Sequence, residues 1–448
     1  MLMSFIRRPV HNALKTSAPV GNHQWRRGTN NKFAIAFTIA LILSAHTTAA
    51  NMPHRGQLSA QQDFARKSAQ FAVNLFNFIY HKEPQNNIIY SPFSIQTCVS
   101  MARMGATGET AAELDRGLGL PLNNEAAIAN TFHNILADYV NSPILKIANK
   151  IYIMDTYKVQ QEFNEIATTK FFSSAENINF ANSEGAANTI NKWVESKTNN
   201  LIKDLIPPAA LSGETRIVLV NAIHFKGEWK HQFPKEATRD DNFYLNEVDS
   251  VRVPMMNLKA TFGFTYLHDL DASVLEMPYK DSDLSMLVIL PSSRTGLATL
   301  HEKLKSFDLS EITQRLTPTK VMVKFPKFKA EFEIELKEAL ENLGMKRMFS
   351  RDAEFGKMLD SDERLQVSKV IHKAFIEVNE EGTEAAAATG VIIRKKRSVM
   401  SSEFHADHPF IYIIQKTFPE YKATSIPLFL GTVNTLNAVV TTEKHDEL

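Results

Sequence analysis

Four consecutive basic residues, Arg394, Lys395, Lys396 and Arg397, followed by Ser398, carry the clearest chemical signal in this chain. Arginine at the first and fourth places offers two planar guanidinium groups, each of which a carboxylate can bind through two hydrogen bonds. An enzyme with acidic subsites would gain affinity from both ends of the run, and the lysines would add long-range attraction. Basic runs are more often solvated surface or nuclear-localisation signals. The residues that precede the run decide between these interpretations.

The segment before the basic run alternates in a way that suits a buried strand. Side chains of a strand alternate between its two faces, so every second residue lies on one side. One set is small or apolar throughout: Thr383, Ala385, Ala387, Thr389, Val391 and Ile393. The other set carries a single charge: Glu384, Ala386, Ala388, Gly390 and Ile392. Four consecutive alanines nevertheless favour helix or loop over strand. The segment therefore predicts two states, first a loop and later a strand.

Residues 380–389, with the sequence Glu-Glu-Gly-Thr-Glu-Ala-Ala-Ala-Ala-Thr, resemble the hinge of inhibitory serpins almost letter for letter. Further segments resemble the same family and occur in the family's order: Asn87–Ile95, Asn221–Trp229, Phe325–Phe328, His408–Phe410 and Phe429–Gly431. On these motifs the chain is identified as a member of the serpin family.

The resemblance implies an α+β fold with about nine helices around three β-sheets. Residues 51–448 would form a single monomeric domain, with an exposed reactive-centre loop at about residues 380–404. A hinge of small residues would let the cut loop enter the main sheet as a new strand. The hinge comprises Glu380, Gly382, Thr383, Glu384, Ala385, Ala386, Ala387, Ala388 and Thr389.

The resemblance also implies a gate for this strand. Trp229 would be the aromatic residue at the upper opening of the main sheet. Beneath the central strands, where they part, a polar cluster would control opening, formed by Ser91, Ser94, Asn221 and His372. From its apolar surroundings alone, His372 is expected to be a hydrogen-bonded core histidine rather than a general base.

Two positions are open for the bond that a protease would cut. The family's spacing from Glu380 places the cut between Lys396 and Arg397, which would suit a trypsin-like enzyme. The Arg-x-x-Arg pattern, which furin-like proprotein convertases cleave, places it between Arg397 and Ser398. We expect the second bond, because a convertase requires arginine immediately before the cut.

These features predict a serine protease inhibitor that is not itself an enzyme. The chain would act as a suicide substrate for furin-like or subtilisin-type proteases, and for trypsin-like ones, trapping each as a covalent acyl-enzyme. Loop insertion by serpins is itself a known example of strand addition and switching. Two alternatives stay open: a non-inhibitory chaperone of the endoplasmic reticulum, and a convertase substrate processed at Arg397. Chaperone members typically depart from the small-residue hinge that this chain keeps.

Composition excludes several other classes. Hydrophobic residues make up 44% of the chain and charged residues 22%, which is typical of a globular protein. The formal net charge of +1 argues against nucleic acid as a partner. A single cysteine, Cys98, in an apolar helical pattern predicts a buried, unreactive thiol and no internal disulfide. No motif for a nucleophilic elbow, zinc or a phosphate loop occurs, so neither metal nor cofactor is expected.

The spacing of apolar residues along the chain predicts helices and strands. Apolar or small residues at Phe64, Ser68, Phe71, Leu75 and Phe78 predict one buried helix face. A second helix is expected at Glu333–Leu343, and a turn that ends a helix at Gly105–Thr110. Apolar, β-branched runs predict strands at Arg216–Val220, Ser285–Leu290, Lys320–Phe325 and Phe410–Ile414.

The ends of the chain predict its location. Basic residues precede the apolar run 33–45, which ends in small residues at 48–50, so residues 1–50 are expected to be a signal peptide and leader. No stable membrane association is expected after its removal. The last residues, His445, Asp446, Glu447 and Leu448, form a signal bound by a retrieval receptor. We expect the lumen of the endoplasmic reticulum and the secretory pathway, with some protein secreted.

Overall fold

The computed structural model describes residues 55–360, 365–383, 401–418, 420, 421 and 424–438, with side chains from residue 60 onward. The expected signal peptide, the hinge from Glu384 onward, the basic run with Ser398 and the retrieval tetrapeptide lie outside these ranges. Four further residues, 361–364, lie outside them as well.

Nine α-helices occur in the described residues, which agrees with the expected number. They are α2 (Arg55–Lys82), α3 (Pro92–Met104), α4 (Gly108–Gly117), α5 (Glu125–Ala137), α6 (Gln161–Phe171), α7 (Ser183–Lys197), α8 (Leu297–Leu304), α9 (Ser310–Arg315) and α10 (Lys337–Asn342). Short 3₁₀ turns lie at Pro208–Ala210, Lys235–Ala237 and Arg347–Phe349. None of the described helices is long and apolar enough to cross a membrane.

Local sequence explains where α2 and α3 form. The predicted face of α2 is confirmed, since Phe64, Ser68, Phe71 and Leu75 are buried and Phe78 is half-buried. Helix α3 begins after Ser91, whose Oγ accepts a hydrogen bond from the Ser94 N–H at 3.1 Å, and Pro92 occupies its first turn. It ends at Met104, with Gly105 as its C-cap, so the predicted end of a helix is confirmed, whereas Gly108–Thr110 already belong to α4.

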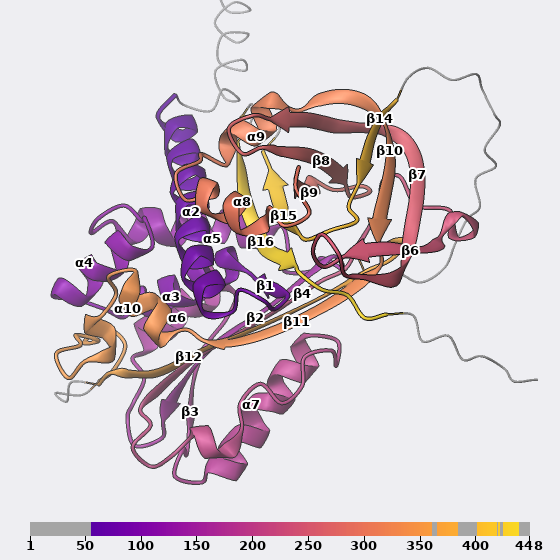
Figure 1. Cartoon of the computed structure of the whole chain (residues 1–448). Coiled ribbons are helices and arrows are strands. Elements are labelled where there is room, and N and C mark those ends of the chain that lie inside the picture. The colour runs from indigo at the N-terminus through magenta and orange to yellow at the C-terminus, as the bar shows by residue number, and fades with distance from the viewer. Residues whose placement is uncertain (1–54, 361–364, 384–400, 419, 422–423, 439–448) are drawn as a thin grey trace, which may run out of the picture. The chain divides into compact units, whose positions relative to one another are not determined.

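The central sheet (Figure 1) carries the candidate site. Its strand order is β3 (Ala175–Ile178), β2 (Leu145–Met154), β4 (Ile217–Phe225), β12 (Val367–Val378), β13 (Gly382–Thr383) and β5 (Gly227–Glu228), and β11 (Phe328–Glu335) pairs with β12. Strands β4 and β12 run parallel to each other, as do β2 and β3, whereas β2 is antiparallel to β4 and β11 is antiparallel to β12. Every residue of β4 is buried, as expected for a strand covered on both faces.

A second sheet contains nine strands. They are β1 (Ile88–Tyr90), β16 (Ser425–Val433), β15 (Phe410–Thr417), β9 (Leu284–Pro291), β8 (Ala272–Pro278), β7 (Ser250–Leu267), β10 (Thr317–Pro326) and β14 (Ser402–His405) in order, with β6 (Arg239–Tyr244) paired to β7. The α+β class is confirmed, and the four predicted strand runs fall in β4, β9, β10 and β15. Where three sheets were expected, the hydrogen-bonded ladders of the described residues form two, because the 18-residue β7 pairs with β6, β8 and β10 in turn.

The expected helix at Glu333–Leu343 begins too early. Residues Glu333–Glu335 continue β11 instead, and α10 starts only at Lys337. Glu333 lies opposite Lys373 of β12, and its carboxylate is 3.3 Å from the Lys373 ammonium group. Pairing with a neighbouring strand therefore overrides the local helix preference of these residues.

Apolar side chains fill both sides of the central sheet. The main core packs between the central sheet, the second sheet and helices α2, α3 and α5. A smaller core lies under α7, where Ala186, Ala187, Ile190 and Val194 contact β2 and β4. Figure 1 shows α7 on the opposite face of the sheet from α3. A strand added between β4 and β12 would therefore meet one core on each face.

Candidate site of strand insertion in the central sheet

At one end of the central sheet, Gly382 and Thr383 form the short strand β13. Thr383 of β13 pairs with Val378 of β12, and on its other side it pairs with Gly227 of β5. Farther along, β12 and β4 pair directly and in parallel, and no strand separates them in the described residues. Their pairing runs from Val367 opposite Ile217 to Phe375 opposite His224. The central strands are thus parted at one end and closed over the rest of their length.

Gly382 is required where the chain turns into β13. Asn379 closes the turn: its N–H donates to the Gly382 carbonyl at 2.8 Å, and its side-chain oxygen accepts from the N–H groups of Glu381 and Gly382 at 3.0 and 3.2 Å. A Cβ atom at position 382 would overlap the carbonyl oxygen of Gly227 and lie 2.6 Å from Cα of Glu228. Only glycine permits so close an approach of two backbones.

Trp229 lies at this end of the sheet. Its indole N–H donates to the Asn379 carbonyl at 3.0 Å, and its backbone N–H donates to the Glu381 carbonyl at 2.8 Å. The ring stacks on Tyr279 with centroids 4.7 Å apart. Tyr279 also shares a 2.9 Å hydrogen bond with the hydroxyl of Thr383, which is fully buried. Burial raises the pKa of Tyr279, so its hydroxyl stays protonated at neutral pH.

Two glutamates hold the base of the hinge against the body of the protein. The Glu380 carboxylate accepts a 2.8 Å hydrogen bond from Thr238 and lies 3.0 Å from the Lys327 ammonium group. Burial alone would raise the pKa of Glu380, but these partners together lower it below its ordinary value. Glu381 is likewise buried and pairs with Lys235 at 2.5 Å.

The predicted polar cluster is one connected network in the structure. His372 of β12 lies directly opposite Asn221 of β4, and its Nδ1 bonds the Asn221 side-chain oxygen. Its Nε2 accepts a hydrogen bond from the Ser91 N–H at 3.1 Å. The Asn221 amide group donates to the Ser94 hydroxyl, and the Ser91 hydroxyl donates to the Leu428 carbonyl at 2.6 Å.

These contacts fix the state of His372. Because Nε2 accepts from a backbone N–H, the ring is neutral and its one proton is on Nδ1. Complete burial lowers the pKa of His372 to about 3, so the ring remains neutral at physiological pH. It holds β4 and β12 together beneath the point where β13 enters, which agrees with a structural role and excludes a general base of ordinary pKa.

Two members of the site were missed from the sequence. Asn149 of β2 receives a hydrogen bond from the Asn221 amide, so it extends the cluster to a third strand. An amide inside the mostly apolar run Leu145–Met154 could have drawn attention to it. Tyr279 follows the end of β8 and carries no comparable signal, because its contacts with Trp229 and Thr383 come entirely from the tertiary fold.

Cys98 and the surrounding residues offer no alternative chemistry. The Cys98 thiol is buried, as predicted, and burial raises its pKa to about 12, which leaves it un-ionised. Within the described ranges no group of three histidine, cysteine, aspartate or glutamate side chains is placed to hold a metal ion. The geometry instead describes a sheet in which the two-residue β13 lies between β12 and β5 at one end, while β12 and β4 pair directly over the rest of their length.

A model of the serpin family, described as serine protease inhibitors, matches residues 66–436. The chain belongs to the serpin family. Serine protease inhibitor 42Dd of Drosophila melanogaster is 40% identical over 351 residues, which cover 78% of this chain and 93% of the fly protein.

Solved serpin structures share the fold over most of both chains. Cleaved Serpin 42Da has 54% identical residues and a TM-score of 0.76, covering 84% of this serpin and 100% of that chain. Serpin48, described as a highly specific serpin of the insect Tenebrio molitor, has 33% identical residues and a TM-score of 0.76. The match covers 84% of this serpin and 99% of that chain. This serpin is therefore a member of a family of serine protease inhibitors with insect and vertebrate relatives.

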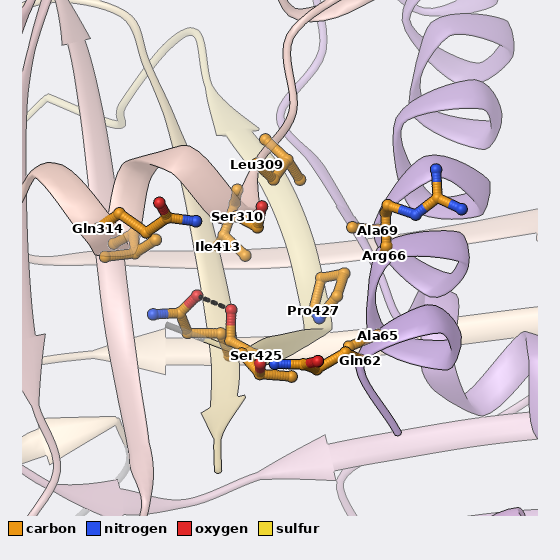
Figure 2. A pocket seen from close by; sticks show the side chains of 13 residues that line it. Gln62, Ala65, Arg66, Ala69, Leu309, Ser310, Gln314, Ile413, Ser425 and Pro427 are labelled. Atoms are coloured by element: carbon orange, nitrogen blue, oxygen red, sulfur yellow. Dashed lines mark hydrogen bonds between the residues drawn. The ribbon is translucent and has the colours of Figure 1, made fainter. Parts of the chain in front are cut away.

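A separate cavity of about 200 Å³ lies between α2, α9 and strands β15 and β16 (Figure 2). Gln62 and Arg66 of α2 and Gln314 of α9 line it, and the hydroxyl of Ser425, another lining residue, donates to Gln415 at 2.9 Å. None of its lining residues belongs to β4, β12 or β13. It is therefore distinct from the site of strand insertion.

Proposed function

We propose that this serpin traps serine proteases of the furin or subtilisin type, and secondarily trypsin-like proteases, as covalent complexes. The protease serine would attack the carbonyl carbon of Arg397, and the nitrogen of Ser398 would leave as an amine after taking a proton. The inhibitor's new C-terminus would then be held as an ester on the protease. Insertion of the cut loop into the central sheet would move the protease before water hydrolyses that ester.

The register of β13 is the observation that carries this proposal. With Thr383 opposite Val378, each later residue of the loop would lie opposite the preceding residue of the antiparallel β12. Arg394 would then lie opposite Val367, the first residue of β12. Residues 383–394 thus match the full length of β12, and the basic run begins where the strand ends. The alternating segment has the length that the slot requires.

The two faces of the slot also suit the two sets of residues. Thr383 is fully buried, as is its partner Val378, which packs in the main core. Residues 385, 387, 389, 391 and 393 would follow it on that face, and all are small or apolar. Glu384 and the other alternate residues would face α7. Thr383 is the one member of this set that the structure describes, and its burial supports the proposal.

Insertion would supply a large driving force. The new strand would form on the order of ten ladder hydrogen bonds at about 1 kcal/mol each, and bury several side chains at about 1 to 2 kcal/mol each. The gain is on the order of 10 to 20 kcal/mol before the entropy of ordering the loop. Such a gain is large compared with the marginal stability of most domains and could distort a bound active site.

The basic run would set specificity for the protease. Arg394 and Arg397 present guanidinium groups at the spacing of the convertase pattern, and a Thr383-to-Arg394 strand leaves Lys395 to Arg397 outside the sheet. Mixing the purified serpin with furin should yield a conjugate that survives boiling in detergent. Cleavage without a conjugate would favour a processed substrate, and the absence of both would favour a chaperone.

Replacing Arg394 tests whether the protease recognises the first arginine of the basic run. Arg394→Ala should weaken inhibition of furin about tenfold or more, because one bidentate contact with a carboxylate is lost. Inhibition of trypsin, which mainly reads the residue before the cut, should change little. Second-order rate constants for both proteases measure this difference, with Lys395→Ala as the matched control. Equal losses for the two enzymes would show that Arg394 is not recognised.

Mapping the cut also decides between the two candidate bonds. Sequencing the new N-terminus after incubation with furin should give Ser398. A fragment that begins with Arg397 would place the reactive bond one residue earlier and would favour a trypsin-like target.

We also propose that the serpin acts in the lumen of the endoplasmic reticulum and the secretory pathway, after removal of residues 1–50. The support is the apolar run 33–45 together with the terminal tetrapeptide 445–448. Deleting the tetrapeptide should shift the protein from cell extract to medium, as measured by immunoblotting both fractions. An unchanged distribution would contradict retrieval.

A further inference from the structure

One edge of the central sheet is only half covered. Strand β3 pairs with β2 from Ile151 to Met154, whereas β4 pairs with β2 along nearly its whole length, from Leu145 to Ile153. In the described residues, Leu145–Lys150 therefore has a partner strand on one side only. Lys146 and Ile147 point to opposite faces of the sheet and both are partly exposed, which agrees with an open edge.

The backbone groups of alternate residues in a strand point to the same side, which shows which groups of β2 face that edge. The Ile151 N–H donates outward to the Ser174 carbonyl at 3.3 Å, and the Asn149 carbonyl accepts outward from the Ser173 hydroxyl. Ile147 is two residues farther along, so its N–H and carbonyl face the same way. Within the described ranges, the Ile147 N–H, the Ile147 carbonyl and the Asn149 N–H have no hydrogen-bond partner. Such groups need water or a ligand.

A cavity of about 760 Å³ borders this half of β2. The ends of three helices form its walls, with Tyr139 and Val140 after α5, Phe172 after α6 and Trp193 on α7. Val140 and Phe172 are two of the five large apolar side chains most exposed in the described structure. Phe172 adopts a left-handed backbone conformation, with φ of 51°, which is unusual for a bulky residue.

The charge of the lining has one sign. Lys146 and Lys197 line the cavity, and no aspartate or glutamate does. Neither lysine is in an ion pair within the part of the chain that the structure describes. Lysine at a sheet edge repels other basic strands and discourages indiscriminate pairing. The same charges would attract a strand with acidic side chains.

We propose that this half of β2, at Leu145–Lys150, binds an extended acidic peptide segment of a partner protein as an added strand. The unpaired backbone groups of Ile147 and Asn149 are two residues apart, which is the spacing at which an added strand forms its hydrogen bonds. This distance is too long for a single carboxylate to bridge. Aromatic side chains of the cavity would hold apolar residues of the peptide, and Lys146 and Lys197 would pair with its carboxylates. A small anionic amphiphile or a second copy of the serpin would use the cavity without this backbone pairing.

The probe is a blocked eight-residue peptide that alternates valine with glutamate and carries fluorescein. Saturable binding to the intact serpin is expected by fluorescence polarisation. Lys146→Glu combined with Lys197→Glu should weaken it about tenfold or more. Lys192→Glu changes an exposed lysine of α7 outside the cavity lining and is the matched control. Absence of saturable binding, or equal losses for the control, would overturn the proposal.

Methylated peptides separate strand addition from simple occupancy of the cavity. Two versions carry N-methyl groups on alternate amides, one set on each edge of the peptide. Pairing with β2 requires that one version bind and the other fail, because only one edge of the peptide donates to the sheet. Any result in which both versions bind alike would overturn the proposal, and it would point to a ligand held by side chains alone. Light scattering measures whether the serpin forms dimers. Loss of peptide binding as dimers form would also overturn the proposal.

Discussion

At the scale of single residues, Thr383 already occupies the position that it would keep in the inserted strand. Its side chain is fully buried and bonds Tyr279. Thr383→Arg would force a cation to lose its hydration in this position, which costs several kcal/mol. The variant should still be cut by furin but form less than about a tenth of the normal conjugate. Gel densitometry of conjugate and cleaved serpin measures the partition, and Thr383→Ser is the control. An undiminished conjugate would contradict strand insertion.

His372 makes stability depend on pH in a defined direction. Its pKa is about 3 in the folded protein against about 6.5 when unfolded, so the unfolded chain binds more protons between these values. The contribution of His372 is fully present above pH 6.5 and is lost as pH falls toward 3, by at most about 1.4 kcal/mol per pH unit.

Urea unfolding between pH 7.5 and 4.5 measures this effect. Other groups titrate over the same range, among them His301, whose pKa burial lowers to about 4. The comparison is therefore between the native serpin and His372→Gln, which cannot take up the proton. The variant should be less stable at pH 7.5 and show a shallower fall with acid. Parallel pH profiles would show that the network around His372 does not depend on its protonation.

At the scale of elements, α7 covers one face of the central sheet, over the strands between which the cut loop would insert. Its residue Ile190 is buried in the core that also contains Val218 of β4 and Ile371 of β12, and Lys150 lies 5.0 Å from the Trp193 ring. Inserting a strand between β4 and β12 must separate these contacts. Ile190→Ala should lower the free energy of unfolding by about 2 to 4 kcal/mol and raise the share of conjugate over cleaved serpin.

Lys192→Ala, on the exposed side of α7, is the control and should change neither quantity by a measurable amount. Urea unfolding and gel densitometry report the two effects separately. If Ile190→Ala lost stability while the partition stayed constant, movement of α7 would not limit insertion.

The elements also show how far sequence reasoning extends. Helix α2 was predicted from the spacing of its apolar residues, and β4 from a continuous apolar, β-branched run, because both signals lie in the local sequence. The strand at Glu333–Glu335 was not, because it exists only through pairing with β12. The polar cluster came from the family resemblance, and its connection to Asn149 emerged only from the fold. Contacts between distant segments, such as Tyr279 with Thr383, leave no local trace.

At the scale of the whole molecule, the proposed trapping requires that the uncut serpin lie above its lowest free-energy state. Direct pairing of β4 with β12 keeps the slot closed, and an intact loop is tethered at both ends, so it cannot enter fully. Cutting the loop should therefore raise the temperature of unfolding. A gain on the order of 10 to 20 kcal/mol corresponds to on the order of 10 to 20 °C for a domain of this size. Calorimetry before and after limited cleavage of the loop by a protease that forms no conjugate with the serpin measures the shift, and cleaved Thr383→Arg, which should gain little, is the control. Equal unfolding temperatures for cut and uncut serpin would show that the molecule holds no energy for trapping a protease.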